Sequence, residues 1–89
     1  MGNYLDAIVA ALDEKLPGHR PELLRFYALL VLTTGIDTTL ENVHDAWSAW
    51  QTATRPEHRS LIPFNELTLE VRELDRPYME AIVSVASDL

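Results

Sequence analysis

The 89-residue chain has no cysteine, only three glycines and no long apolar segment. Without cysteine it can form neither a disulfide nor a thiolate metal site, and it has no thiol nucleophile. Three separate glycines exclude a glycine-rich loop of the kind that cradles phosphate. The longest apolar run, residues 26–32, is far shorter than the roughly 20 residues that a membrane-spanning helix needs. These absences exclude several classes of enzyme and predict a chain that does not cross a membrane.

Basic residues are also scarce, because seven Lys and Arg stand against fourteen Asp and Glu and give a net charge of −7. This charge has the wrong sign for a protein that binds nucleic acid or an anionic membrane surface. A hydrophobic content of 47% is enough for a core, and 24% charged residues is typical of a folded protein. We therefore expect one domain, residues 1–89, with no nucleic-acid or membrane partner.

The first six residues carry neither a basic segment nor a cleavage site for a signal peptide. Gly2 follows Met1, but N-myristoylation also favours Ser or Thr at position 6, where the chain has Asp6. The sequence therefore predicts a cytoplasmic location.

Apolar residues recur at helical spacing along the chain, and no alternation typical of a β-strand is visible. The helices that this spacing predicts cover residues 4–16, 21 to about 34, 39 to about 52–55, 69–74 and about 77–86. We therefore predict an all-α protein, a compact bundle of four to five short helices with one ordered, proline-containing loop at about residues 54–67.

The expected helix ends follow from local residue types. Asn3 is a good N-cap, and Gly35 suits the position just after the second helix. Thr38 with Glu41 fits the capping box at the start of the third helix. Pro77 should break the C-terminal segment near residues 75–76, because proline lacks the N–H of the backbone ladder.

The second helix carries only one charge, Arg25, between residues 23 and 32. A helix that is apolar all round must be covered all round, and a second copy of the chain could supply part of that cover. We therefore expect a symmetric homodimer formed through the first or second helix. The candidate interface residues are Leu23, Phe26, Tyr27 and Leu30.

The third helix should pack through an apolar stripe made of Leu40, Val43, Trp47 and Trp50. Gln51 and Glu41 should face away from it. Glu41 and His44 have the E-x-x-H spacing of di-iron bundles, but such bundles need the motif twice. The favoured interpretation is a polar outer face, and we expect no metal site.

The loop after this helix is stiffened by two prolines, and its apolar residues 61–64 should pack onto the helices. Its basic side chains, Arg55, His58 and Arg59, should stay exposed. Beyond it, Thr68 should cap a helix that turns Val71 and Leu74 inward. We expect His19 to be a solvated loop residue.

No catalytic arrangement is visible. The serines lack a nucleophile elbow or a triad, and the carboxylate pairs after residue 65 are explained by a solvated helix face. We therefore expect neither enzymatic activity nor a cofactor.

A basic and aromatic cluster is the strongest candidate for a ligand site, and its members are Trp47, Trp50, Arg55, His58 and Arg59. Arginine near an indole face commonly holds a phosphate or a carboxylate. In an acidic chain, such a local positive area would attract a small anion. The alternative is that the tryptophans are core residues, Trp47 more deeply than Trp50, and that the arginines are only solvated. The helical spacing of the tryptophans favours this alternative.

Three segments together follow the order of a known pattern: Val-His-Asp-Ala-Trp at residues 43–47, His-Arg-Ser-Leu-Ile-Pro-Phe-Asn-Glu-Leu at 58–67 and Arg-Glu-Leu-Asp-Arg at 72–76. This pattern resembles the ryanodine-receptor-type (RyR) domain over about residues 43–76, most specifically from Leu61 to Leu67. From Asn3 to Tyr78 the chain is also similar to small proteins encoded by actinobacteria and their phages.

The RyR resemblance implies a non-catalytic helical module that binds nucleotide-derived ligands or partner proteins, and it points to Trp47 and to residues 58–64. A phage-encoded protein would act in the host cytoplasm. Two hypotheses follow. The first is a small accessory protein of a phage or an actinobacterium that acts by protein binding and self-association. The second is a ligand-binding module for a small anion or nucleotide, through Trp47, Arg55, His58 and Arg59.

Overall fold

The computed structural model describes residues 2–89; Met1, at the start of the segment considered for targeting, lies outside them. The described residues form five helices and no strand: α1 (Tyr4–Lys15), α2 (Pro21–Thr33), α3 (Leu40–Thr54), α4 (Leu69–Glu73) and α5 (Arg76–Ser87). Two short 3₁₀ turns, η1 (Gly35–Asp37) and η2 (Phe64–Glu66), lie between helices. The prediction of a small all-α bundle is confirmed. None of these helices has the length and apolar character that crossing a bilayer requires.

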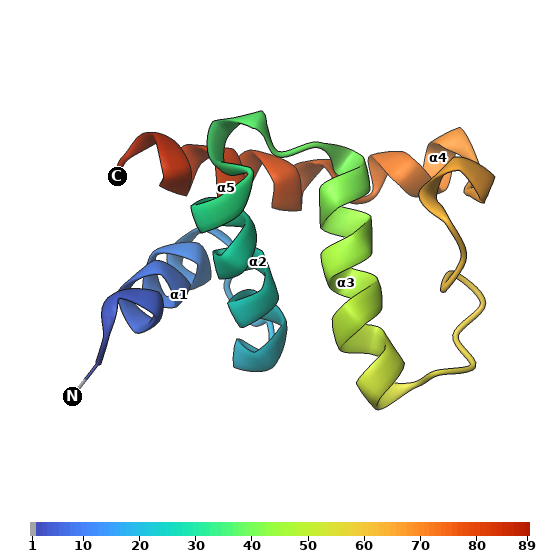
Figure 1. Ribbon diagram of the computed structural model, residues 1–89, viewed down its shortest axis with the longest axis horizontal. Coiled ribbons are helices and arrows are strands. Elements are labelled where there is room, and N and C mark those ends of the chain that lie inside the picture. The colour runs from blue at the N-terminus through green and yellow to red at the C-terminus, as the bar shows by residue number, and fades with distance from the viewer. Residues whose placement is uncertain (1) are drawn as a thin grey trace.

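α2 is the central helix, since it packs against α1, α3 and α5. α5 runs along the length of the molecule, and η1 packs on it. α3, the loop of residues 55–63 and α4 lie at the end opposite to α1 (Figure 1). This extension makes the molecule 38 Å long and 25 by 21 Å across.

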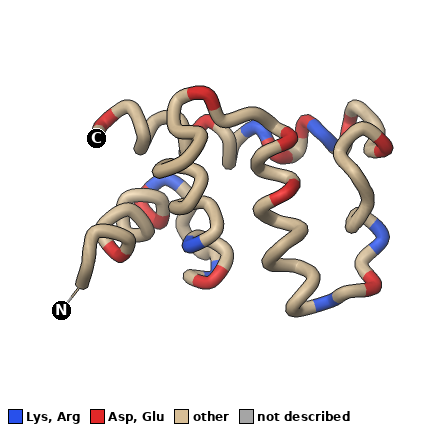
Figure 2. The backbone as a smooth tube through the Cα atoms, in the orientation of Figure 1, with Lys and Arg blue, Asp and Glu red and all other residues tan. Residues whose placement is uncertain are grey.

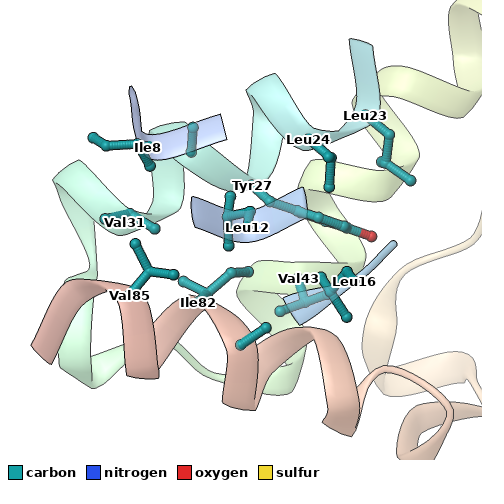
Figure 3. Packing of buried hydrophobic residues seen from close by; sticks show 12 residues of the cluster. Ile8, Leu12, Leu16, Leu23, Leu24, Tyr27, Val31, Val43, Ile82 and Val85 are labelled. Atoms are coloured by element: carbon teal, nitrogen blue, oxygen red, sulfur yellow. The ribbon is translucent and has the colours of Figure 1, made fainter. Parts of the chain in front are cut away.

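The core is made mainly by α1, α2 and α5 (Figure 3). Its buried members are Ile8, Leu12, Leu16, Leu23, Leu24, Tyr27, Ala28, Val31, Val43, Ala81, Ile82 and Val85. Leu12, Val43 and Ile82 have no exposed surface. Each such aliphatic side chain contributes about 1.5–3 kcal/mol by its removal from water. α3 supplies Val43 alone to this cluster, so the core lies largely at the α1 end of the molecule.

Most predicted helix ends are confirmed. Asn3 caps α1 through a reciprocal pair of hydrogen bonds with Asp6, of 3.0 and 3.2 Å. Gly35 follows α2 with a positive φ of 56°, a backbone conformation that glycine adopts without steric cost. Pro77 stands in the first turn of α5, directly after the break that separates α4 from α5.

The cap of α3 differs from the prediction by one residue. Thr39, not Thr38, is the N-cap, and its capping box is completed by Asn42 instead of Glu41. Thr38 is buried. Its hydroxyl donates to the Gly35 carbonyl at 2.7 Å and lies 2.6 Å from the Thr34 hydroxyl. Closure of the η1 turn therefore uses the side chain that was expected to cap the helix.

The polar face of α3 was expected to face water, which holds for Glu41 and Asp45 but is wrong for the rest of it. His44 and Gln51 are buried and Ser48 is half-buried, and the three share one face at i, i+4 and i+7. The chain reverses after Thr54 and runs back beside α3 (Figure 1), so that the loop covers this face. Leu74 is the opposite case: expected inside, it is 69% exposed because it lies at the end of the five-residue α4.

The apolar run of α2 is covered on three sides by the chain's own helices. Leu23 and Tyr27, two of the four candidate interface residues, are 7% and 1% exposed and lie in the core. Phe26 and Leu30 are half-buried. Burial within one chain removes Leu23 and Tyr27 from any surface that a second copy could reach.

Candidate functional site

A pocket of about 430 Å³ lies where α2, α3, the loop and the junction between α4 and α5 meet. Five of its lining residues carry rings, namely Tyr27, His44, Trp47, His58 and Tyr78. The others are Leu23, Val71 and Leu74, which are apolar, and Ser60 and Asp75, which are polar. Apolar and aromatic walls with a few polar groups are typical of sites for small molecules.

His44 holds the loop against α3. Its Nε2 lies 2.7 Å from the Ile62 carbonyl oxygen, and because a carbonyl only accepts, Nε2–H is the donor. The imidazole also stacks on Trp47, with 5.8 Å between ring centroids. His44 is thus a buried, hydrogen-bonded residue and not part of an exposed E-x-x-H pair; Glu41 stays exposed.

His58 closes the loop side of the pocket. Its Nδ1 accepts the Ser60 backbone N–H at 3.0 Å, which shapes the turn. Its ring meets Trp47 edge to face, with centroids 5.1 Å apart, a favourable geometry for aromatic pairs. His58 is therefore half-buried against the indole, where the sequence led us to expect an exposed side chain.

Arg72 ties α4 to the turn before it. Its guanidinium donates to the carbonyl oxygens of Leu67 at 3.1 Å and Asn65 at 2.9 Å, and it lies 4.9 Å from the centre of the Phe64 ring. The segments that carry the RyR resemblance are joined by these contacts and by the bond of His44. These segments supply six of the residues that line the pocket, namely His44, Trp47, His58, Ser60, Leu74 and Asp75.

Tyr78 and His19 form a second polar pair beside the core. His19 Nδ1 lies 2.9 Å from the Leu16 carbonyl oxygen and Nε2 lies 3.1 Å from the Tyr78 hydroxyl. With Nδ1–H donating to the carbonyl, a neutral ring accepts the Tyr78 O–H at Nε2. His19 is therefore half-buried and engaged, which corrects the expectation of a solvated residue.

Tyr27 presents its hydroxyl to the pocket. The side chain is 1% exposed, and the hydroxyl has no hydrogen-bond partner among residues 2–89. Every fully buried side-chain nitrogen or oxygen of these residues has a partner, so the Tyr27 oxygen must be reached from the pocket that it lines. Figure 3 shows this oxygen at the edge of the core cluster. Burial raises the pKa of this hydroxyl above its ordinary value, and the charge of Asp75 adds to the shift.

Among residues 2–89, Asp75 is the one carboxylate on the pocket wall. It is the N-cap residue of α5, yet its side chain makes no capping hydrogen bond. It also takes no part in an ion pair within residues 2–89, where Arg76 pairs with Glu73 instead. Burial raises the pKa of the Asp75 carboxyl, and the nearby His44 acts in the opposite direction. Asp75, Tyr27 and His44 thus line the same pocket.

The basic and aromatic cluster expected from the sequence is divided by the structure. Trp47 and His58 line the pocket, while Trp50 lines a separate hollow with Arg20 and Phe26. Arg55 and Arg59 are exposed and do not line the pocket. The loop that carries them lies at the end of the molecule opposite to α1 and includes basic positions, drawn blue in Figure 2. Both tryptophans are half-buried, so neither is a full core residue.

Tyr27, which the sequence suggested only as an interface residue, and Asp75 are pocket residues that were not predicted, and the same is true of His44 and Tyr78. The signal for Tyr27 was its phenol oxygen, the only side-chain polar group besides Arg25 between residues 23 and 32. The signal for Asp75 was an acidic residue at a proline break, where the chain turns. Within residues 2–89 no group of three His, Cys, Asp or Glu is placed to hold a metal ion.

The chain was compared with known proteins. Neither the curated proteins nor the solved structures include a match. The model of one family, Domain of unknown function (DUF7701), matches residues 3–87, nearly the whole chain and all five helices. The protein therefore belongs to the DUF7701 family.

Proposed function

We propose that the protein is a non-catalytic binding module that takes a small molecule in the pocket between α2, α3, the loop and the α4–α5 junction. One observation carries this proposal: the Tyr27 hydroxyl and the Asp75 carboxylate line one pocket and neither has a protein partner. Within residues 2–89 no fully buried polar side-chain atom lacks a partner, so these two groups are reached from the pocket and are satisfied there by water or by a ligand. A bound ligand would supply the missing partners, and perturbed titratable groups in a cleft are typical of functional sites.

Binding is favoured over catalysis by the way the other polar groups are engaged. His44 uses Nε2 for the Ile62 carbonyl, and His58 uses Nδ1 for the backbone of Ser60. Neither ring is paired with a nucleophile in the way that a catalytic base requires. Ser48 lies 3.5 Å from His44 Nε2, but it is not among the residues that line the pocket.

Two matched variants test the proposal. Leu74 and Leu69 are both exposed on the α4 segment, but only Leu74 lines the pocket. Leu74→Trp should fill the rim of the pocket, whereas Leu69→Trp should leave it open. In a ¹H–¹⁵N NMR screen of a fragment library, we expect compounds that shift the Trp47 indole signal. Their binding should weaken in Leu74→Trp and persist in Leu69→Trp; an equal response of both variants would place the binding elsewhere.

Self-association is a second candidate function, and the outer face of α2 favours it. Leu29 and Leu32 are 54% and 44% exposed at i, i+3 spacing, where both can meet a second copy. A stable interface needs on the order of 1,200 Å² of buried area, so neighbouring residues would have to contribute. Light scattering should give twice the 10.1 kDa chain mass, and Leu29→Glu should restore the monomer. A wild-type monomer at micromolar concentration would exclude this candidate.

A further inference from the structure

We propose that the ligand of this pocket is a protonated primary or secondary amine with an apolar body, its nitrogen bound between Asp75 and Tyr27. This inference rests on the proposed function of the pocket as a binding site. It replaces the anion expected from the sequence by a ligand of opposite charge.

The charge of the pocket wall supports a cation. Asp75 is the only acidic lining residue, and no Lys or Arg lines the pocket within the part of the chain described. The nearest candidates are otherwise engaged: Arg72 donates to backbone carbonyls and Arg76 is paired with Glu73. A partly buried carboxylate is stabilised by a cation in contact with it, and an anionic ligand would instead be repelled. A cationic ligand would therefore supply the positive charge that no lining Lys or Arg provides beside Asp75.

The rings around the pocket also suit an organic cation. The ring centroids of Tyr27 and Tyr78, on α2 and α5, lie 5.7 Å apart. On the loop side, the Trp47 ring contacts the rings of His44 and His58. The faces of Trp and Tyr attract cations within about 6 Å through the ring quadrupole. The same rings offer apolar surface to the body of the ligand, together with Leu23 and Val71.

The Tyr27 hydroxyl selects among organic cations. The Tyr27 side chain is 1% exposed, its oxygen is reached from the pocket that it lines, and this oxygen has a free acceptor position. An ammonium group with N–H bonds can donate to both this oxygen and the Asp75 carboxylate. A quaternary ammonium has no N–H and would leave both oxygens without a hydrogen bond. The geometry therefore favours a primary or secondary amine.

Three probes of similar size and different charge test this proposal: 2-phenylethylamine, which is protonated at neutral pH, 2-phenylethanol, which is neutral, and 3-phenylpropionate, which is an anion. Each probe is titrated into the ¹⁵N-labelled protein up to about 10 mM probe, which covers the weak affinity expected for fragments. We expect the amine to shift the Trp47 indole signal and the Asp75 and Tyr78 amides, with an affinity about tenfold above that of the alcohol. The carboxylate should bind more weakly than the alcohol.

Asp75→Asn and Glu73→Gln are matched variants, since each removes one carboxylate charge and Glu73 does not line the pocket. Asp75→Asn should reduce amine affinity to that of the alcohol, and Glu73→Gln should leave the tenfold preference intact. Equal affinity for amine and alcohol in the wild type, or tighter binding of the carboxylate, would overturn the amine proposal while leaving the pocket a binding site. If none of the probes shifts the pocket signals, both the amine proposal and the proposed function fail.

Discussion

Eleven of the twelve core residues come from α1, the residue after it, α2 and α5, whereas α3 contributes Val43 alone and the loop and α4 contribute none. The α1–α2–α5 region is thus held by apolar burial, which is non-directional and spread over many side chains. α3 also packs on α2, through Val43 and the half-buried Ala46, Trp47 and Trp50. The loop and α4 are instead held by a few directed contacts, mainly the hydrogen bonds that His44, His58 and Arg72 make to backbone atoms.

This difference explains where the pocket lies. Leu23, Tyr27 and Tyr78 reach it from the apolar region, and the opposite wall is the loop that His44 and Trp47 support. Close packing would have filled the space between the two regions. A loop fixed by single hydrogen bonds can instead stand off from the core and leave a cavity. The pocket lies where the two regions meet.

The largest effect should come from the apolar region. Leu12→Ala removes a side chain with no exposed surface, and we expect a loss of about 2–5 kcal/mol in the free energy of unfolding. Leu5→Ala on the same helix is the control, because Leu5 is 36% exposed and its truncation should cost much less. Urea denaturation followed by circular dichroism measures both. Similar losses of unfolding free energy in the two variants would show that the buried face of α1 contributes no more to stability than its exposed face.

A smaller and local effect should follow from His44→Ala. This change removes the bond to Ile62 and the stacking on Trp47, and we expect a loss of about 1–3 kcal/mol. Hydrogen exchange should speed up over residues 55–63 and in α4, with little change at the centre of α2. Uniform acceleration throughout the chain would show instead that the two regions unfold as one unit.

The smallest effect, and one of opposite sign, should come from Asp75→Asn. Because burial raises the pKa of Asp75, the folded state binds a proton more readily than the unfolded state. The unfolding free energy contributed by Asp75 therefore rises as pH falls through its folded-state pKa, and the ionised form reduces stability at neutral pH. We expect Asp75→Asn to raise Tm at pH 7 by about 1–4 °C, since the group is partly exposed. This gain should vanish toward the ordinary aspartate pKa of about 3.9.

Glu73→Gln is the control for this measurement, since the hydrogen bond from Arg76 lowers the pKa of Glu73. Its carboxylate favours the folded state above the ordinary glutamate pKa, and that contribution is lost as pH falls. Removal of the charge should therefore lower Tm slightly at neutral pH. A fall in Tm for Asp75→Asn as well would show that the Asp75 charge is stabilised within the protein.

Local signals were enough to predict most of the fold. Asn3, Gly35 and Pro77 set chain ends and breaks through their own backbone chemistry, so their effect does not depend on distant residues. The same holds for the apolar spacing that defines α1. The error at Thr38 arose because two neighbouring hydroxyls could cap α3, and the tight η1 turn engages one of them.

The site could be predicted only in part. The sequence indicated Trp47 and the loop, since aromatic and apolar residues there were too many for a free segment. It gave the wrong exposure for His44 and His58, because that exposure depends on which helix face the returning loop covers. Asp75 and Tyr27 are 48 positions apart in the chain, and only the packing of α5 beside α2 brings them to one pocket.

The most direct test of amine binding between Asp75 and Tyr27 is a crystal structure of the protein with 2-phenylethylamine. We expect the phenyl ring to lie among Trp47, Tyr27 and Tyr78. The nitrogen should lie within about 2.7–3.2 Å of both an Asp75 carboxylate oxygen and the Tyr27 hydroxyl. A structure in which the amine is bound elsewhere, with the Asp75 carboxylate turned out to solvent, would contradict it.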